Sequence, residues 1–138
     1  MTLLDAYALI AFLVGGPSTA QVRGILREGD VAVATANLVE ALDISRRVHG
    51  LPIPRANEIL EPLFESALGV VALDRGNAFR AAEIRAEYYH RSTRPISLAD
   101  AVLLASAKRG DRIATADPDV LAVAEAEELE SVPLPRQS

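Results

Sequence analysis

Short apolar runs alternate with longer helix-like segments along the whole chain. The runs that we expect to be strands cover residues 2–4, 31–34, 70–73 and 112–115, and residues 129–134 are expected to add an edge strand. Strands that alternate with helices pair in parallel, because each crossover places a helix on one face of the sheet. The sequence therefore predicts an α/β protein of three layers, α/β/α, around a central and mainly parallel sheet of four to five strands.

The segments between these runs carry helix start and stop signals. Ser18, Asp74, Ser97 and Asp117 stand where N-caps are expected, and glycines close several of the segments. We predict helices over residues 6–14, 19–28, 35–48, 54–68, 75–90, 98–109 and 120–127. With 138 residues, 50% of them hydrophobic, and no linker-like stretch, the chain is expected to form one domain over residues 1–138.

Composition and charge exclude several classes of function. The formal net charge of −5 argues against a protein that coats nucleic acid through a basic surface, although not against a nuclease whose acids bind cations. The chain has no cysteine, which excludes disulfides, thiol catalysis and cysteine-based zinc sites. No apolar run is long enough for a bilayer and the first residues lack signal-peptide features, so we expect a cytoplasmic protein with no membrane partner.

One predicted helix places an acid on its apolar side. Ser97 opens this helix, and Asp100 three residues later completes a Ser-x-x-Asp capping signature. At about 100° per residue, Asp100 shares a face with Leu103 and Leu104. Carboxylates are rarely buried without a partner, and this helix supplies no cation on the same face. The partner of Asp100 must therefore come from elsewhere in the chain.

Three further acids stand close to strand ends. Asp5 follows the first strand, Asp117 follows the fourth, and Glu40 lies in the second turn after the strand 31–34. The carboxyl ends of parallel strands meet at one edge of the sheet, so these acids and Asp100 are expected to converge there. Bound divalent cations relieve the repulsion between clustered carboxylates. Because no histidine accompanies the acids, Mg²⁺ or Mn²⁺ fits better than zinc.

Each acid also has a purely structural explanation. Asp5 is explained as a turn residue at a strand end, Asp117 as an N-cap, and Glu40 as a solvated glutamate beside polar neighbours. Asp119 is explained either as a first-turn helix acid or as a further metal ligand. The joint placement of the acids, rather than any one of them, favours a functional site.

Four segments carry a family resemblance through their order and spacing. They are Leu3-Leu4-Asp5-Ala6-Tyr7-Ala8-Leu9-Ile10, Thr35-Ala36-Asn37-Leu38-Val39-Glu40, Ser97-Leu98-Ala99-Asp100-Ala101 and Ala114-Thr115-Ala116-Asp117-Pro118-Asp119. In these segments the chain resembles the PIN domain family and, within it, the toxin nucleases of the VapC type. The resemblance implies that Asp5, Glu40, Asp100 and Asp117 are catalytic and hold one or two Mg²⁺ or Mn²⁺ ions for the cleavage of RNA.

The resemblance also implies partners for this chain. RNA would be the substrate, a VapB-type antitoxin would inhibit the enzyme, and the toxin would be a homodimer that contacts DNA only through the antitoxin. The first motif of the family often has Ser or Thr after the leading Asp, where this chain has Ala6 and then Tyr7. A hydroxyl contact from residue 6 to Asp5 is therefore missing from the expected site.

Residues that would contact substrate are less sharply indicated. The hydroxyls of Thr35 and Thr115 are candidates to support the acids or to contact RNA. Four arginines on the predicted helix 75–90 and in the loop before Ser97 are candidates for phosphate contacts beside the acids; they are Arg80, Arg85, Arg91 and Arg94. The alternative for these arginines is a solvated helix face that pairs with Glu83 and Glu87.

Other functions share parts of this pattern. A housekeeping RNA-processing nuclease would carry the same acids, and a PIN-fold binding module that has lost catalysis would keep only the fold. A phosphoacceptor receiver domain also has acids at strand ends, but it needs a lysine at a strand end. The only lysine is Lys108, which we place in the last turn of the helix 98–109, so the nuclease is favoured.

Overall fold

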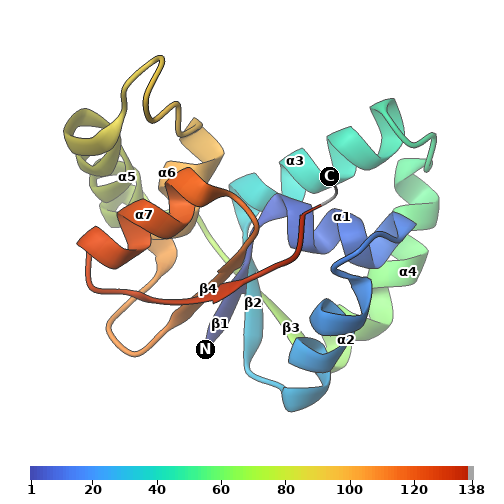
Figure 1. Cartoon of the computed structure of the whole chain (residues 1–138). Coiled ribbons are helices and arrows are strands. Elements are labelled where there is room, and N and C mark those ends of the chain that lie inside the picture. The colour runs from blue at the N-terminus through green and yellow to red at the C-terminus, as the bar shows by residue number, and fades with distance from the viewer. Residues whose placement is uncertain (137–138) are drawn as a thin grey trace.

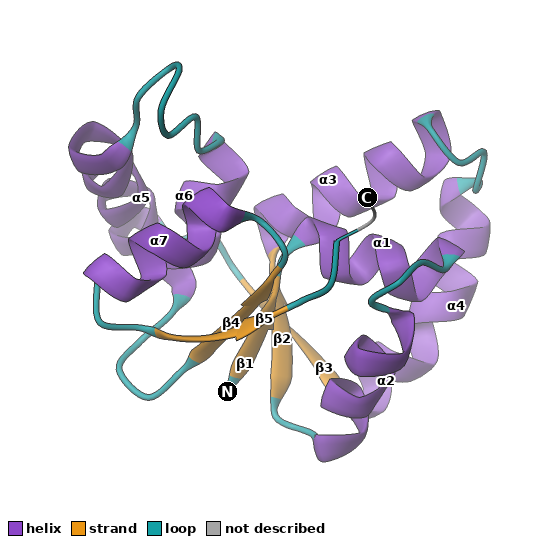
Figure 2. Cartoon of the chain, viewed as in Figure 1, coloured by secondary structure: helices purple, strands orange, loops and turns teal. Residues whose placement is uncertain are grey.

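A five-stranded parallel sheet forms the middle layer of the protein, whose computed structural model describes residues 1–136 (Figures 1 and 2). The strands are β1 (Thr2–Leu4), β2 (Val31–Ala34), β3 (Leu68–Val71), β4 (Arg112–Thr115) and β5 (Glu130–Pro133). They lie in the order β3-β2-β1-β4-β5, and every neighbouring pair is parallel. The predicted α/β class and its parallel sheet are confirmed, with β1 at the centre.

Helices cover both faces of this sheet. They are α1 (Ala6–Val14), α2 (Thr19–Glu28), α3 (Thr35–Arg47), α4 (Ile53–Ser66), α5 (Arg75–Tyr88), α6 (Leu98–Ser106) and α7 (Pro118–Ala126). Side chains of a strand point alternately to its two faces. Leu4 and Val33 therefore pack with α1, α2 and α4, whereas Leu3, Ala32 and Ile113 pack with α5, α6 and α7. Figure 1 shows these two helical groups on opposite sides of the strands.

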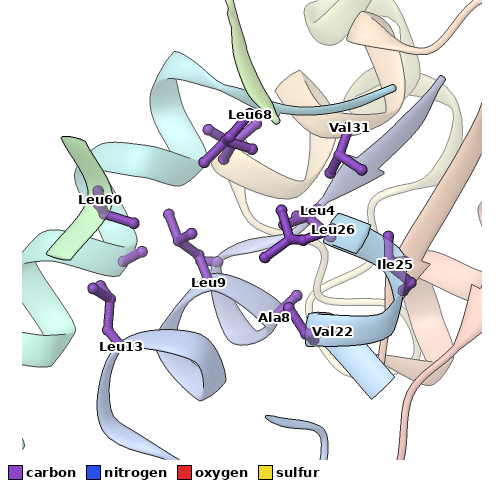
Figure 3. Close-up of a cluster of buried hydrophobic side chains, with 14 of the residues drawn as sticks. Leu4, Ala8, Leu9, Leu13, Val22, Ile25, Leu26, Val31, Leu60 and Leu68 are labelled. Atoms are coloured by element: carbon purple, nitrogen blue, oxygen red, sulfur yellow. The ribbon is translucent and has the colours of Figure 1, made fainter. Parts of the chain in front are cut away.

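The core beneath α1 fixes the position of the residues that begin this helix. Leu9 is fully buried, and Figure 3 shows it among side chains from other elements, including Leu60 of α4 and Leu68 of β3. Truncating a buried leucine to alanine costs about 2–5 kcal/mol of stability. This packing holds α1, and with it the N-cap residue Asp5, firmly against the end of β1.

Several predicted boundaries differ from those in the structure, with the largest shifts at β3, α4 and α6. The third strand begins at Leu68, two residues before the predicted start, because Leu68 and Gly69 already pair with Val31 and Ala32 of β2. Helix α4 consequently ends at Ser66 instead of residue 68. Gly69 is exposed on this edge strand, and its missing side chain does not prevent its backbone from pairing with Ala32.

Helix α6 ends earlier than residue 109. Its last residue is Ser106, and the Lys108 N–H donates to the Asp111 carboxylate (2.8 Å) in the turn that follows. This side-chain acceptor replaces the next helical carbonyl and stops the helix. Lys108 therefore lies beyond the last turn in which it was predicted.

Ser18 precedes α2 without capping it through its side chain. Its hydroxyl instead donates to the Pro135 carbonyl (2.6 Å), far along the chain.

Over the described residues, no single helix is long and apolar enough to cross a membrane. Helices α1 and α2 taken together meet the criteria of length and composition alone, with a bend of 105° between them.

Candidate active site

The two central strands each end in an aspartate. Asp5 follows β1 and Asp117 closely follows β4, and these strands are direct neighbours because Leu4 pairs with Ala114. Each aspartate caps the helix that follows: Asp5 Oδ1 accepts the Ala8 N–H (2.8 Å), and Asp117 Oδ1 accepts the Asp119 N–H (2.8 Å). A cap bond needs only one oxygen, so each carboxylate retains acceptor capacity for a ligand.

The other two acids come from helices α6 and α3. Asp100 and Ser97 form the predicted capping box: the Ser97 N–H donates to Asp100 Oδ2 (3.1 Å), and the Asp100 N–H donates to Ser97 Oγ (3.0 Å). Glu40 lies on α3, and the Asn37 side-chain amide of α3 donates to the Ala99 carbonyl of α6 (3.3 Å). This bond joins the two helices that carry Glu40 and Asp100.

These acids meet around one pocket. The pocket has a volume of about 230 Å³ and is lined by Asp5, Ala6, Tyr7, Glu40, Ser97, Asp100, Ala116, Asp117 and Arg136. The sequence predicted that the acids would converge at the carboxyl ends of the strands, and the structure brings all of Asp5, Glu40, Asp100 and Asp117 to this edge.

Burial and mutual repulsion disfavour negative charge in the pocket. Burial raises the pKa of Asp5 to about 6, and the charges of Asp100 and Asp117 add to this rise, whereas hydrogen bonds from Thr115 and Ala8 oppose it. Burial also raises the pKa of Asp100, with further contributions from Asp117 and Asp119. The pKa of Glu40 is raised by burial and then by the charge of Asp100. The pocket thus contains carboxylates whose negative charge is poorly compensated.

No cation of the described chain neutralises these acids through an ion pair. Within residues 1–136, the salt bridges involve other acids, including Asp43 paired with Arg47 (3.4 Å) on α3. The partner that Asp100 was expected to find elsewhere is its own capping serine. A positive charge from outside the chain would therefore stabilise the ionised pocket.

The oxygen atoms of the pocket acids are the type of ligand that a hard divalent cation binds. The acids that line the pocket offer oxygen, which Mg²⁺ and Mn²⁺ prefer, and no histidine lines it in the described part of the chain. Across residues 1–136, however, no three acids or histidines stand close enough together to form a preassembled metal site. The carboxylates would have to draw closer around an ion.

The remaining candidate residues near the acids differ in their placement. Thr115 is fully buried; its hydroxyl accepts the Asp117 N–H (3.1 Å) and hydrogen-bonds with Asp5, so it links the two strand-end acids. Thr35 instead donates to the Val71 carbonyl of β3 (3.0 Å) and is not among the described lining residues. Asp119 also lies outside that lining, and its charge acts on Asp100.

The four candidate arginines lie around α5 and the loop after it. Arg80 pairs with Glu127 at the end of α7, rather than with Glu83 or Glu87 as the solvated-face alternative proposed. Arg85 donates to the Ile96 carbonyl (3.1 Å) and stacks 4.2 Å from the Tyr89 ring, and Arg94 lies 5.9 Å from the Tyr88 ring. Neither these three nor Arg91 line the acid pocket in the described structure.

Sequence reasoning missed two residues of the pocket. Arg136 reaches it from the end of the described chain, and Tyr7 lines it from α1. The sequence contained one signal for Arg136, the prolines at 133 and 135, which favour an extended, restrained segment after the last strand. The position of Arg136 beside the acids depends on the parallel pairing of β5 with β4, which no local sequence pattern indicates.

Solved structures with the same fold include toxin–antitoxin proteins. VapC20 of Mycobacterium tuberculosis, described as a Sarcin-Ricin loop cleaving toxin, is 17% identical with a TM-score of 0.71, covering 88% of this chain and 94% of that chain. FitAcB from Neisseria gonorrhoeae is 24% identical with a TM-score of 0.66, over 95% and 96% of the two chains. VapBC2 from Rickettsia felis, bound to a DNA fragment from its promoter, is 13% identical with a TM-score of 0.68, over 97% and 98%. At these identities the likeness shows the fold alone.

A family model identifies the chain more directly. Comparison with curated protein sequences finds no match. The model of the PIN domain matches residues 2–126, a stretch that runs from β1 to the end of α7 and contains all four acids of the pocket. The chain therefore belongs to the PIN domain family.

Proposed function

We propose that this protein is a divalent-metal-dependent endoribonuclease and the toxin of a toxin–antitoxin pair. The observation that carries the proposal is one pocket lined by Asp5, Glu40, Asp100 and Asp117, which form no ion pair within residues 1–136. Membership of the PIN domain family and the fold shared with VapC20 support a nuclease at this position. Residues 1–138 would act as a single nuclease domain.

The pocket acids would hold one or two Mg²⁺ or Mn²⁺ ions, with Asp119 as a further acid beside them. When bound, such an ion supplies a water of lowered pKa and positive charge against the phosphate. The chain itself holds the acids in place: the Ala8 N–H and the Thr115 hydroxyl orient Asp5, and the capping box orients Asp100. With a pKa of about 6, Asp5 releases its proton near neutral pH and becomes available as a ligand.

The proposed partners follow from the family and from the named neighbours. VapC20 is described as a Sarcin-Ricin loop cleaving toxin, and VapBC2 was solved with a DNA fragment from its promoter. By analogy, this chain would act on RNA in the cytoplasm as a homodimer and bind a VapB-type antitoxin. Contact with DNA would then be made only through the antitoxin.

The first test is cleavage of a mixed pool of structured RNAs by the purified protein. We expect cuts with Mg²⁺ or Mn²⁺, no cuts with EDTA, and no cuts by Asp100→Asn with either metal. The asparagine keeps an oxygen that can accept the Ser97 N–H, so the capping box is retained while the charge is lost. Cleavage that persists in EDTA or in Asp100→Asn would contradict the proposed chemistry.

A second test does not depend on knowing the RNA. Ions that bind only the folded state raise its stability by RT ln(1 + [L]/Kd), about 1–2 kcal/mol at roughly ten to thirty times Kd. We therefore expect Mg²⁺ or Mn²⁺ to raise the thermal unfolding temperature of the wild type more than that of Asp100→Asn. Equal shifts in both proteins would show that the metal binds elsewhere.

The toxin role requires a separate experiment in cells. Induced expression of the wild type is expected to arrest growth, and co-expression of the neighbouring gene is expected to restore it. The Asp100→Asn variant, expressed to the same level, is the control that links the arrest to the pocket. Normal growth with a cleaving enzyme would favour a housekeeping RNA-processing role.

A further inference from the structure

The last described residues return from the sheet to the acid pocket. After β5 ends at Pro133, Leu134 is buried and its N–H donates to the Thr115 carbonyl (2.9 Å), immediately before Ala116 and Asp117. Figure 1 shows this segment leaving the sheet towards α1. We name residues 134–136 the C-terminal strap.

Two hydroxyl groups hold the strap by a single carbonyl. The Pro135 carbonyl accepts hydrogen bonds from Tyr7 Oη (2.7 Å) and from Ser18 Oγ (2.6 Å), and these two oxygens lie 3.4 Å apart. Ser18 is fully buried, so its bond is shielded from competing water. Proline also restricts its own backbone angle, which lowers the entropy lost on ordering the strap. The backbone that leads into Arg136 is therefore anchored at the Leu134 N–H and at the Pro135 carbonyl.

Arg136 is the one positively charged residue among the described residues that line the pocket. It forms no ion pair with Asp5, Glu40, Asp100 or Asp117 within residues 1–136, and it is exposed. It is therefore available to an anion instead of serving as the counter-ion of the acids. A guanidinium suits phosphate in particular, because its planar donors bind two phosphate oxygens at once.

We propose that Arg136 contacts a backbone phosphate of RNA bound in the acid pocket, and that Tyr7 and Ser18 position it through the Pro135 carbonyl. The inference rests on the proposed function, since it assigns a substrate contact at the same site. The acids repel an RNA strand, and a cation beside them offsets that repulsion for one phosphate. Arg136 thereby contributes mainly to binding, whereas the acids carry the chemistry.

Steady-state cleavage of a short RNA substrate tests this division of roles. Arg136→Ala is expected to raise KM about tenfold, as the loss of one charge-assisted contact implies, with kcat within about twofold of the wild type. Arg136→Lys keeps the charge and should recover part of the loss. Arg55→Ala is the matched control, because Arg55 is an exposed arginine of α4 that pairs with Glu58 outside the pocket.

Binding without cleavage gives an independent measurement. In the Asp100→Asn background, a fluorescent single-stranded RNA should bind about tenfold more weakly when Arg136 is replaced by alanine. The slope of log K against log salt should also fall by about 0.7, the contribution of one phosphate contact to a single strand. A purely structural role of Arg136 would leave this salt slope unchanged.

The anchor is tested by removing one hydroxyl. Tyr7→Phe keeps the ring and deletes the bond to Pro135, so we expect KM to rise about threefold, in line with the loss of a neutral hydrogen bond. In the Arg136→Ala background the same change should have little effect, because the residue that it positions is gone. Equal effects in both backgrounds would show that Tyr7 acts directly on RNA and would overturn the anchoring role.

The outcomes separate this inference from the proposed function. If the wild type cleaves RNA and Arg136→Ala has the same KM, the phosphate contact is wrong while the nuclease stands. Faster cleavage by Arg136→Ala would show that the strap obstructs the pocket and would also overturn the contact. If the wild type neither binds nor cleaves RNA, the proposed function fails and this inference fails with it.

Discussion

Two aspartates of this protein have the same local structure and very different surroundings. Asp5 and Asp74 each cap a helix in an extended backbone conformation, and each accepts the N–H three residues later at 2.8 Å, from Ala8 and Asn77 respectively. Asp5 is buried in the acid pocket at the end of the central strand β1. Asp74 is exposed and follows β3, at the edge of the sheet.

The difference between them comes from sheet order instead of local sequence. The chain builds β1, β2 and β3 towards one edge and then crosses to place β4 and β5 on the other side of β1. In open parallel sheets, ligands bind where the strand order reverses in this way. Asp5 and Asp117 stand at that point between β1 and β4, whereas Asp74 stands two strands away. A helix cap becomes a candidate catalytic group only because of where its strand lies.

Cleavage should separate the two aspartates most strongly. Asp5→Asn is expected to lower the cleavage rate about a thousandfold, equivalent to about 4 kcal/mol in the barrier, because a charged metal ligand is lost. Asp74→Asn should cleave within about twofold of the wild type, since it changes an exposed cap outside the pocket. Initial rates at saturating Mg²⁺ measure both. A comparable loss in the two variants would place the chemistry elsewhere.

Stability as a function of pH should distinguish the two caps next. The pKa of Asp5 is raised from 3.8 to about 6, which corresponds to about 3 kcal/mol at most. Because this carboxyl binds its proton more tightly in the folded state, the free energy of unfolding falls as pH rises from about 4 to 6. Above pH 6 it falls no further on account of Asp5. Asp5→Asn should therefore raise the free energy of unfolding above pH 6 by about 1–3 kcal/mol, with little gain near pH 4.

Urea unfolding at pH 4.5 and pH 7.5 without divalent metal measures this effect. Burial also raises the pKa values of Asp100 and Glu40, so the stability of Asp5→Asn should still fall somewhat as pH rises. Asp74→Asn should follow the wild type at both pH values. If Asp5→Asn is no more stable at pH 7.5, the ionised Asp5 is better compensated than the pocket indicates.

Local signals were enough to predict most of the fold and the four acids. The caps at Asp74, Ser97 and Asp117 depend on residues close in sequence, and the runs 31–34 and 112–115 have the composition of covered parallel strands. The convergence of the acids followed from a general property of parallel sheets and needed no exact register.

Contacts between distant segments could not be predicted in the same way. Arg80 meets Glu127 only because α5 and α7 pack on one face, and the strap reaches Tyr7 only because β5 pairs with β4. Ser18 has an ordinary capping sequence, yet its hydroxyl bonds to Pro135 instead of to its own helix. These interactions depend on the side on which each strand joins the sheet, which strand periodicity leaves open.

The smallest expected effect isolates the capping bond that the two aspartates share. Asp74→Ala should lower the free energy of unfolding by about 1 kcal/mol, whereas Asp74→Asn, which keeps the acceptor, should change it by only a few tenths of a kcal/mol. Asp5→Ala loses the same bond but also removes a buried charge, so the two effects oppose each other above pH 6 and only the lost cap remains near pH 4. Urea unfolding of Asp74→Ala should therefore show the same loss in the free energy of unfolding at every pH. For Asp5→Ala, we expect a loss near pH 4 that shrinks or reverses by pH 7.5. Parallel curves for the two variants would mean that Asp5 is no more than a helix cap.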